Sequence, residues 1–251
     1  MTIAPVAGTR GLCIVLGCGE IGSAIAHRLA QSGHAVALVD EADPPWSRRG
    51  FAFTDAWYVG TASLEARSAV FCASVRSIPS VLARGSIAAT TWSWAGIAAA
   101  IEPLAVIDAR SALGRSALDW RRRQGAFARI AVGAAPSDAG ADRVVPLPLE
   151  PRGEESGRVH APQNGRFVTG RRIGDEVIAG ETLGAVGGVP VIAPLDGVLR
   201  GLSARGARVP AGFEVVAVDA RRDAKVFGLD ARGSAVAAEV WLALQAAPVL
   251  R

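Results

Sequence analysis

Three glycines in the stretch Gly17-Cys18-Gly19-Glu20-Ile21-Gly22 have the spacing of loops that bind dinucleotides. In such loops Gly17 would permit the tight turn, Gly19 would let a pyrophosphate approach the backbone, and Gly22 would let a helix pack on a strand. Asp40 follows Gly17 by 23 residues, where a carboxylate can accept hydrogen bonds from ribose hydroxyls. The pattern therefore predicts a cofactor-binding loop made of Gly17, Gly19, Gly22 and Asp40.

The same loop also serves as plain architecture in proteins that hold no nucleotide. Glu20, at the expected helix start, suits the helix dipole but would repel an incoming phosphate. Cys18 is either a small loop-filling residue or a thiol at a ligand site. Both readings of the loop stay open at this point.

The elements around the loop predict an α/β fold with a Rossmann-like parallel sheet. Leu12–Leu16 and Ala35–Val39 are short apolar runs typical of strands buried on both faces. Ile21, Ile25 and Leu29 recur every four residues and form one face of a helix between them. Further strands are expected at 56–59, 69–73, 87–90 and 104–108, with short helices at 75–84 and 94–101.

The second half of the chain contains an internal repeat. The segment that starts at Ala161 and the one that starts at Ala193 align at a constant offset of 32 residues, with prolines, glycines and valines at matching places. Each copy reads as strand, glycine turn and strand, and two such copies can interleave into a flattened barrel because neither can bury its apolar face alone.

This repeat resembles the barrel-sandwich hybrid of biotinyl and lipoyl carrier domains. Those carriers place a modified lysine on the hairpin between the two copies, which here is Gly187-Gly188-Val189. The chain has one lysine, Lys225, outside the repeat. We therefore expect no covalent biotin or lipoate on this half.

The patterns divide the chain into four parts. We expect a Rossmann-like nucleotide-binding-type domain at 1–113, a linker or irregular extension at 114–157, a small all-β barrel-sandwich hybrid domain at 158–222, and a C-terminal helical tail at 223–251.

Composition excludes several classes of protein. The net charge of +4 is small for 251 residues and no basic face with interleaved aromatics is visible, which argues against nucleic-acid binding. Three scattered cysteines and three histidines lack the spacing of metal ligands or a disulfide framework. The apolar stretch 87–107 is broken by Glu102-Pro103, so no membrane span is expected. We expect a cytoplasmic protein without a metal site.

Beyond the glycine loop, two stretches carry a family resemblance. They are "RRGFAFTDAWYVG" at 48–60, and "IGDEVIAGE" at 173–181 followed by "GVLRGL" and "VDAR". The chain is similar over residues 11–113 and 158–245 to the YqeB-type selenium-dependent molybdenum hydroxylase system proteins, which are related to the XdhC maturation factors. The resemblance implies an accessory protein that helps to mature or load a molybdenum hydroxylase-type client. Its ligand would be an anionic dinucleotide or molybdenum cofactor, and a homo-oligomer stays open.

The resemblance also implies roles for a pair of arginines. Arg48 and Arg49 would bind phosphate or pterin-type anions, since guanidinium groups form paired hydrogen bonds with them, while Arg200 would approach from the second half. We expect both arginines to be exposed and to matter little for stability. The alternative is a surface ion pair with Asp43 or Asp55.

The middle of the chain departs from the family pattern. The region "IAVGAAPSDAGADRVVPLPLEP" is short, and Asp219-Ala220-Arg221 stands where the family has Asp-Pro-Arg. Two alternatives to an accessory protein therefore remain. One is a non-catalytic structural subunit of a complex, and the other is an NAD-dependent oxidoreductase. The latter lacks an evident proton donor, and catalytic residues stay unassigned.

Overall fold

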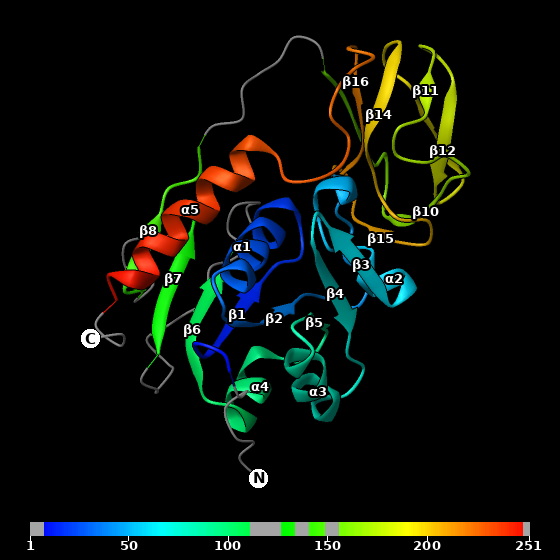
Figure 1. The fold of residues 1–251 in the computed structure, drawn as a ribbon. Coiled ribbons are helices and arrows are strands. Elements are labelled where there is room, and N and C mark those ends of the chain that lie inside the picture. The colour runs from blue at the N-terminus through cyan, green and yellow to red at the C-terminus, as the bar shows by residue number, and fades with distance from the viewer. Residues whose placement is uncertain (1–7, 111–126, 134–140, 149–155, 248–251) are drawn as a thin grey trace.

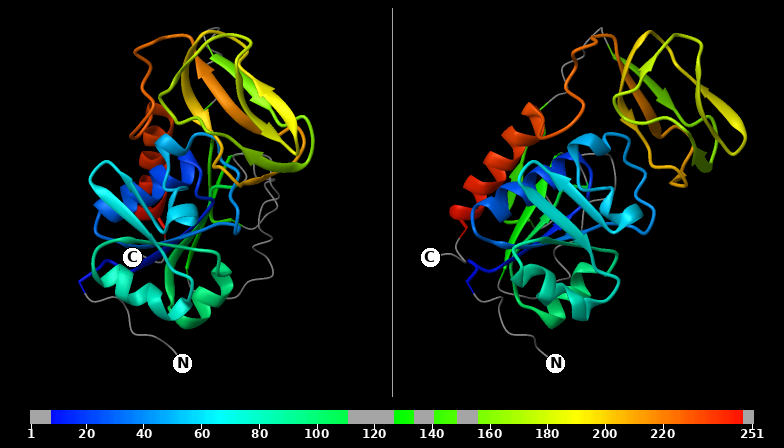
Figure 2. Two further views of the ribbon diagram at one scale, coloured as in Figure 1. Left: turned by 90° about the vertical axis from the view of Figure 1, so that its right-hand side faces the viewer. Right: turned by 45° about the vertical axis from the view of Figure 1, so that its right-hand side comes forward.

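The chain forms two halves of different architecture, a large parallel sheet with helices and a smaller part built only of strands (Figure 1). The structure, a computed structural model, describes residues 8–110, 127–133, 141–148 and 156–247. The C-terminal helix packs on the first half. The chain therefore leaves the first half for the second and then returns to the first (Figure 2).

The large sheet has eight strands in the order β3-β4-β5-β2-β1-β6-β7-β8. All neighbours run parallel except the β3–β4 pair. The strands are β1 (Leu12–Leu16), β2 (Ala35–Val39), β3 (Thr61–Leu64), β4 (Arg67–Phe71), β5 (Ile87–Thr90), β6 (Pro103–Asp108), β7 (Ala128–Val132) and β8 (Arg143–Val145).

Helices cover both faces of this sheet. They are α1 (Glu20–Gln31), α2 (Ala56–Val59), α3 (Ile78–Ala83), α4 (Trp94–Ala100) and α5 (Ala231–Gln245), with single 3₁₀ turns η1 (Arg49–Phe51) and η2 (Val75–Ser77). Cys13 and Val15 of β1 pack into the core under α1 and α5, whereas Leu12, Ile14 and Leu16 face the core under α3 and α4. Alternate side chains of this one buried strand thus pack against the helices on opposite faces of the sheet, as expected for a parallel sheet.

Most of the local expectations for this half are confirmed, and two are wrong. β1 and β2 have the expected bounds, and α1 and β5 lie where the patterns place them. The stretch 56–59, expected as a strand, is the helix α2. So short an apolar run does not by itself distinguish a strand from a helix. The stretch 114–157, expected as a linker or irregular extension, supplies β7 and β8 to the sheet.

The second half consists of two four-stranded antiparallel sheets, in the orders β13-β12-β10-β15 and β11-β14-β16-β9. Their strands are β9 (Ser156–His160), β10 (Gly165–Val168), β11 (Glu176–Val177), β12 (Thr182–Val186), β13 (Val189–Ile192), β14 (Gly197–Leu202), β15 (Arg208–Val209) and β16 (Glu214–Asp219). The finer assignment to the barrel-sandwich hybrid family stays a prediction.

The internal repeat is visible in the strands of this half. β10, β11 and β12 begin 32 residues before β14, β15 and β16 respectively. The two copies pair crosswise, since β10 bonds to β15 of the other copy and β11 bonds to β14. This exchange of strands lets the two copies share one core, centred on Phe167, Leu199 and Val216.

The two halves are joined by direct hydrogen bonds. The amide of Leu202 donates to the carbonyl of Ser47 over 2.7 Å, and the hydroxyl of Ser203 donates to the carbonyl of Pro45 over 2.8 Å. The segment after β2 is thereby fixed against the end of β14. Within the described ranges, no helix is both long and apolar enough to cross a membrane.

Candidate functional site

The glycine loop has the geometry that its first and third glycines predict. Gly17 has a φ of +98°, and its amide donates to the carbonyl of Val39 over 2.8 Å. A Cβ on Gly22 would lie 1.8 Å from the carbonyl oxygen of Gly17. Glycine at these two positions is therefore required by the turn and by the close approach of α1 to β1.

Asp40 is bonded within the protein. One of its carboxylate oxygens accepts hydrogen bonds from the amide of Cys18 over 2.7 Å and from the indole of Trp46 over 2.8 Å. The other oxygen accepts from the amide of Glu41, and the residue is buried. The predicted ribose acceptor therefore holds the glycine loop and a tryptophan together, and its role toward a ligand stays a prediction.

Trp46 lies directly over the second glycine. A Cβ on Gly19 would lie 3.3 Å from the indole ring. The ring also packs against Phe213 of the second half, with 5.8 Å between ring centroids. Sequence reasoning missed this residue, because nothing local to Trp46 indicates that it folds back over the loop.

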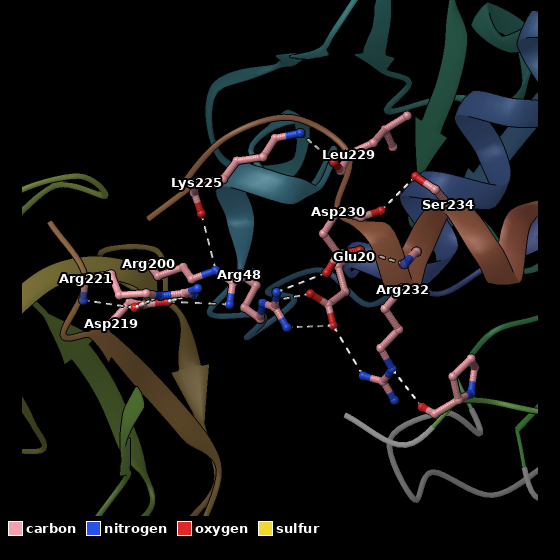
Figure 3. Close-up of polar contacts among 12 residues, drawn as sticks. Glu20, Arg48, Arg200, Asp219, Arg221, Lys225, Leu229, Asp230, Arg232 and Ser234 are labelled. Atoms are coloured by element: carbon pink, nitrogen blue, oxygen red, sulfur yellow. Dashed lines mark hydrogen bonds and ion pairs between the residues drawn. The ribbon is translucent and has the colours of Figure 1, made fainter. Parts of the chain in front are cut away.

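Arg48 lies among carboxylates at the junction between the helices (Figure 3). Its guanidinium lies 2.8 Å from a carboxylate oxygen of Glu20 and 3.0 Å from one of Asp230, and it stacks over the ring of Phe51. Its side chain is 16% exposed, so the expectation of an exposed residue is wrong. The carboxylates offset the cost of removing this charge from water.

Arg49 is also drawn into the fold. Its guanidinium donates to the carbonyl of Leu202 over 2.8 Å and forms an ion pair with Asp55. The alternative of an ion pair with Asp55 is thus confirmed for Arg49, although its own side chain is 17% exposed rather than at the surface. Anion binding by the two arginines stays a prediction.

Arg200 approaches Arg48 from the second half, as expected. The two guanidinium groups lie over the same Phe51 ring, each 5.1 Å from its centroid. Burial, followed by the charge of Arg48, lowers the pKa of Arg200. Asp219 lies 3.9 Å away and opposes this effect. A pKa shifted by burial and by a neighbouring charge is a feature of functional sites, and also of structural ion-pair networks.

A cavity of about 230 Å³ lies between the two halves, at the carboxyl end of β1. The glycine loop and the start of α1 form one side, and Phe213 and Glu214 of the second half form another. The charged and titratable groups that line it are Glu20, Arg48, Arg158, His160, Glu214 and Arg232. Five separated segments of the chain therefore supply its polar lining.

Three arginines and two glutamates line this cavity, and Arg48 is also paired with Asp230 beside it. Glu20 is shared between Arg48 and Arg232, whose guanidinium lies 3.6 Å from it. Glu214 accepts from Arg158 over 3.1 Å and from the hydroxyl of Ser47 over 2.7 Å. The amides of the first turn of α1 add partial positive charge at the same place. Each arginine of the lining is nevertheless paired with a carboxylate, so anion binding here stays a prediction.

Sequence reasoning missed Arg158, His160 and Arg232 as lining residues. Arg158 and His160 are two apart on β9 and so point to the same face, which is a signal that alternation along the strand could have given. Arg232 follows the N-cap of α5, and only the return of that helix to the sheet brings it to the cavity.

Burial shifts the pKa values of Cys18, His27 and His34 toward their uncharged forms. Burial, followed by the charge of Asp40, raises the pKa of the Cys18 thiol, which disfavours a thiolate. Burial lowers the pKa of His27 and of His34. In the described part of the chain, no group of three or more His, Cys, Asp or Glu side chains could hold a metal ion.

A second hollow of about 550 Å³ lies across the carboxyl ends of β1, β2, β5 and β6. Asp40, Glu41, Thr91, Ser93 and Arg110 supply its polar lining. The guanidinium of Arg110 is fixed by two hydrogen bonds of 2.9 Å to the carboxylate of Asp108. Open parallel sheets bind ligands at this edge.

Comparisons with known proteins support the fold of the first half. Residues 13–82 match the family model of ketopantoate reductase PanE/ApbA. The protein YqeB of Escherichia coli strain K12, whose own description is uncharacterized, is 25% identical over 242 residues. That match covers 86% of this chain but 44% of YqeB, so the chain spans less than half of its relative. The findings are consistent with a YqeB-type protein that has a Rossmann-like half.

Among solved structures, a succinylglutamate desuccinylase/aspartoacylase from Rhodobacter sphaeroides matches at 16% identity. The match covers 76% of this chain and 59% of the other, with a TM-score of 0.25. So low a TM-score supports no relationship of fold or function.

Proposed function

We propose that this chain is a non-redox accessory protein that binds a phosphate-type anion in the cavity between its halves. The observation that carries the proposal is the meeting of Arg48, Arg158 and Arg232, from three distant segments, at the start of α1. Guanidinium groups form paired hydrogen bonds with phosphate or carboxylate oxygens, and amides at a helix start add to them.

The size of the cavity limits what lies inside it. Its volume of about 230 Å³ is below the range of roughly 300–1,000 Å³ that whole small-molecule sites occupy. We therefore assign to it the anionic end of a ligand, with the rest of the ligand outside. Because both halves line the cavity, such a ligand would also tie them together.

The client in this proposal is a molybdenum hydroxylase-type enzyme. The similarity to YqeB supports this assignment only through the family resemblance of the sequence, and the chain corresponds to less than half of YqeB. The ligand would then be a nucleotide-like or pterin-type anion that the protein holds for its client.

A dinucleotide-dependent oxidoreductase is the second candidate. The match of residues 13–82 to a reductase family favours it, and so does the hollow at the strand ends. His160 in the cavity could transfer a proton in such a reaction. Asp40 and Glu41 at the end of β2 would repel a 2′-phosphate, so NAD would be preferred over NADP.

Calorimetric titration with inorganic phosphate tests the leading proposal. Replacement of Arg158 by Ala should weaken phosphate binding about tenfold or more, because a charged hydrogen bond contributes roughly 1.5–3 kcal/mol. Arg84→Ala, on the exposed end of α3, is the matched control and should leave the affinity unchanged. Equal affinity in wild type and Arg158→Ala would place any phosphate elsewhere. Co-purification with a molybdenum enzyme tests the client separately.

A further inference from the structure

We infer that Trp46 restricts the cavity to phosphomonoesters and excludes dinucleotides from the glycine loop. This inference rests on the proposed function and specifies its ligand class. A phosphomonoester carries one organic group and ends in its phosphate. A dinucleotide carries organic groups on both sides of an internal pyrophosphate, so it needs two paths away from the loop.

The first step is the space over the second glycine. A loop of this type uses glycine there so that a pyrophosphate can lie against the backbone. Here a mere Cβ on Gly19 would lie 3.3–3.5 Å from three atoms of the Trp46 indole. The indole therefore fills the space that the absence of a side chain on Gly19 would otherwise leave to the ligand.

The second step is the path toward the end of β2. In a dinucleotide complex one ribose lies at this strand end, where the acidic residue accepts its hydroxyls. In this chain the Asp40 carboxylate already accepts from the Trp46 indole over 2.8 Å and from the Cys18 amide over 2.7 Å. A ribose at Asp40 would have to break the bond to Trp46, which bars the shortest path from the cavity.

The third step is the rigidity of the tryptophan. Trp46 is 5% exposed and packs against Gly19 and Phe213, with its indole bonded to Asp40. The neighbouring Ser47 carbonyl accepts from the Leu202 amide over 2.7 Å, which fixes the backbone beside it. Swinging the indole out would forfeit the packing and leave the buried Asp40 carboxylate without one of its donors, which is costly.

Outside the space that the indole fills, the cavity can hold one anionic group. Arg158 and Arg232 line it together with the start of α1. A phosphate with a single organic group can be held there, with the group directed out of the cavity. The glycine loop of this chain thus keeps its fold but accepts a shorter ligand than its spacing suggests.

Parallel titrations with inorganic phosphate and NADH test the inference on the full chain. Phosphate is followed by calorimetry, and NADH by energy transfer from tryptophan. Wild type should bind phosphate, and NADH should not compete with it at millimolar concentration. Trp46→Ala should gain NADH binding by about tenfold or more.

Trp46→Leu keeps more of the packing against Phe213 and serves if the alanine variant does not fold. Trp57→Leu, which removes a partly buried indole packed on Phe71, is the control and should not gain NADH binding. NADH that competes with phosphate in wild type would overturn the inference, as would a folded Trp46 variant that gains nothing. Absence of phosphate binding in wild type would instead refute the proposed function.

Discussion

The guanidinium of Arg48 lies 3.0 Å from the carboxylate of Asp230, although 182 residues separate them. Asp230 is the N-cap of α5, and its other carboxylate oxygen accepts from the amide of Gly233 over 2.6 Å. The same guanidinium reaches Glu20 in the first turn of α1. A single arginine therefore fixes the starts of both helices that cover one face of the sheet (Figure 3).

Replacing Arg48 by Ala should lower the free energy of unfolding by roughly 1–3 kcal/mol, because two largely buried carboxylates lose a charged partner. Urea denaturation measures the change. Arg84→Ala, at an exposed position, should stay within about 0.5 kcal/mol of wild type. Equal stability of the two variants would mean that solvent already screens the Arg48 pairs.

Gly22→Ala should destabilise the fold by roughly 1–3 kcal/mol or more, because its Cβ would lie 1.8 Å from the Gly17 carbonyl oxygen. Alanine favours a helix interior by about 1 kcal/mol over glycine, so a loss here must come from the clash. Gly19→Ala, at the N-cap, should cost at most about 1 kcal/mol. Thermal unfolding compares the two, and a Gly22 variant as stable as the Gly19 variant would contradict the close approach of α1 to β1.

Arg221→Ala should remove a pH-dependent part of the stability. Hydrogen bonds from the Arg221 side chain lower the pKa of the buried Asp219 carboxyl. A lowered carboxyl pKa stabilises the fold above the ordinary value of about 3.9, and this contribution is lost as the pH falls through the folded-state pKa. The difference between wild type and variant should therefore be largest near neutral pH and shrink toward pH 3.

The size of this effect should be roughly 1 kcal/mol, because the Arg221 side chain is 56% exposed and solvent screens it. Urea unfolding at several pH values gives the profile. A difference that stays constant from neutral to acid pH would show that Arg221 acts through packing instead.

The intact mass of the purified protein should equal that of the polypeptide, with no biotinyl or lipoyl increment. The hairpin between β12 and β13 turns at Gly187 and Gly188, both with positive φ, and carries no lysine. Lys225 lies outside the repeat and its ammonium donates to the carbonyl of Leu229 over 2.7 Å. Mass spectrometry checks this, and an added cofactor mass on any residue would refute it.

The sequence by itself determined the elements whose cause is local. The apolar runs of β1 and β2 and the glycine turn between strand and helix predict their bounds, because a strand buried on both faces needs an uninterrupted apolar stretch. The repeat at 32 residues predicted matching strands in the second half, since equal sequences adopt equal local structure.

Only the tertiary structure decided what occupies the candidate site. Trp46 lies over Gly19, Arg48 meets Asp230, and Arg158 lines the same cavity as the start of α1. Each of these relationships joins segments that local propensity treats independently. They form because folding brings partly buried charges and apolar rings together, where an unpaired charge or an empty space would cost free energy. The spacing of the glycines could therefore predict a loop, but not that Trp46 of the same chain fills the space over Gly19.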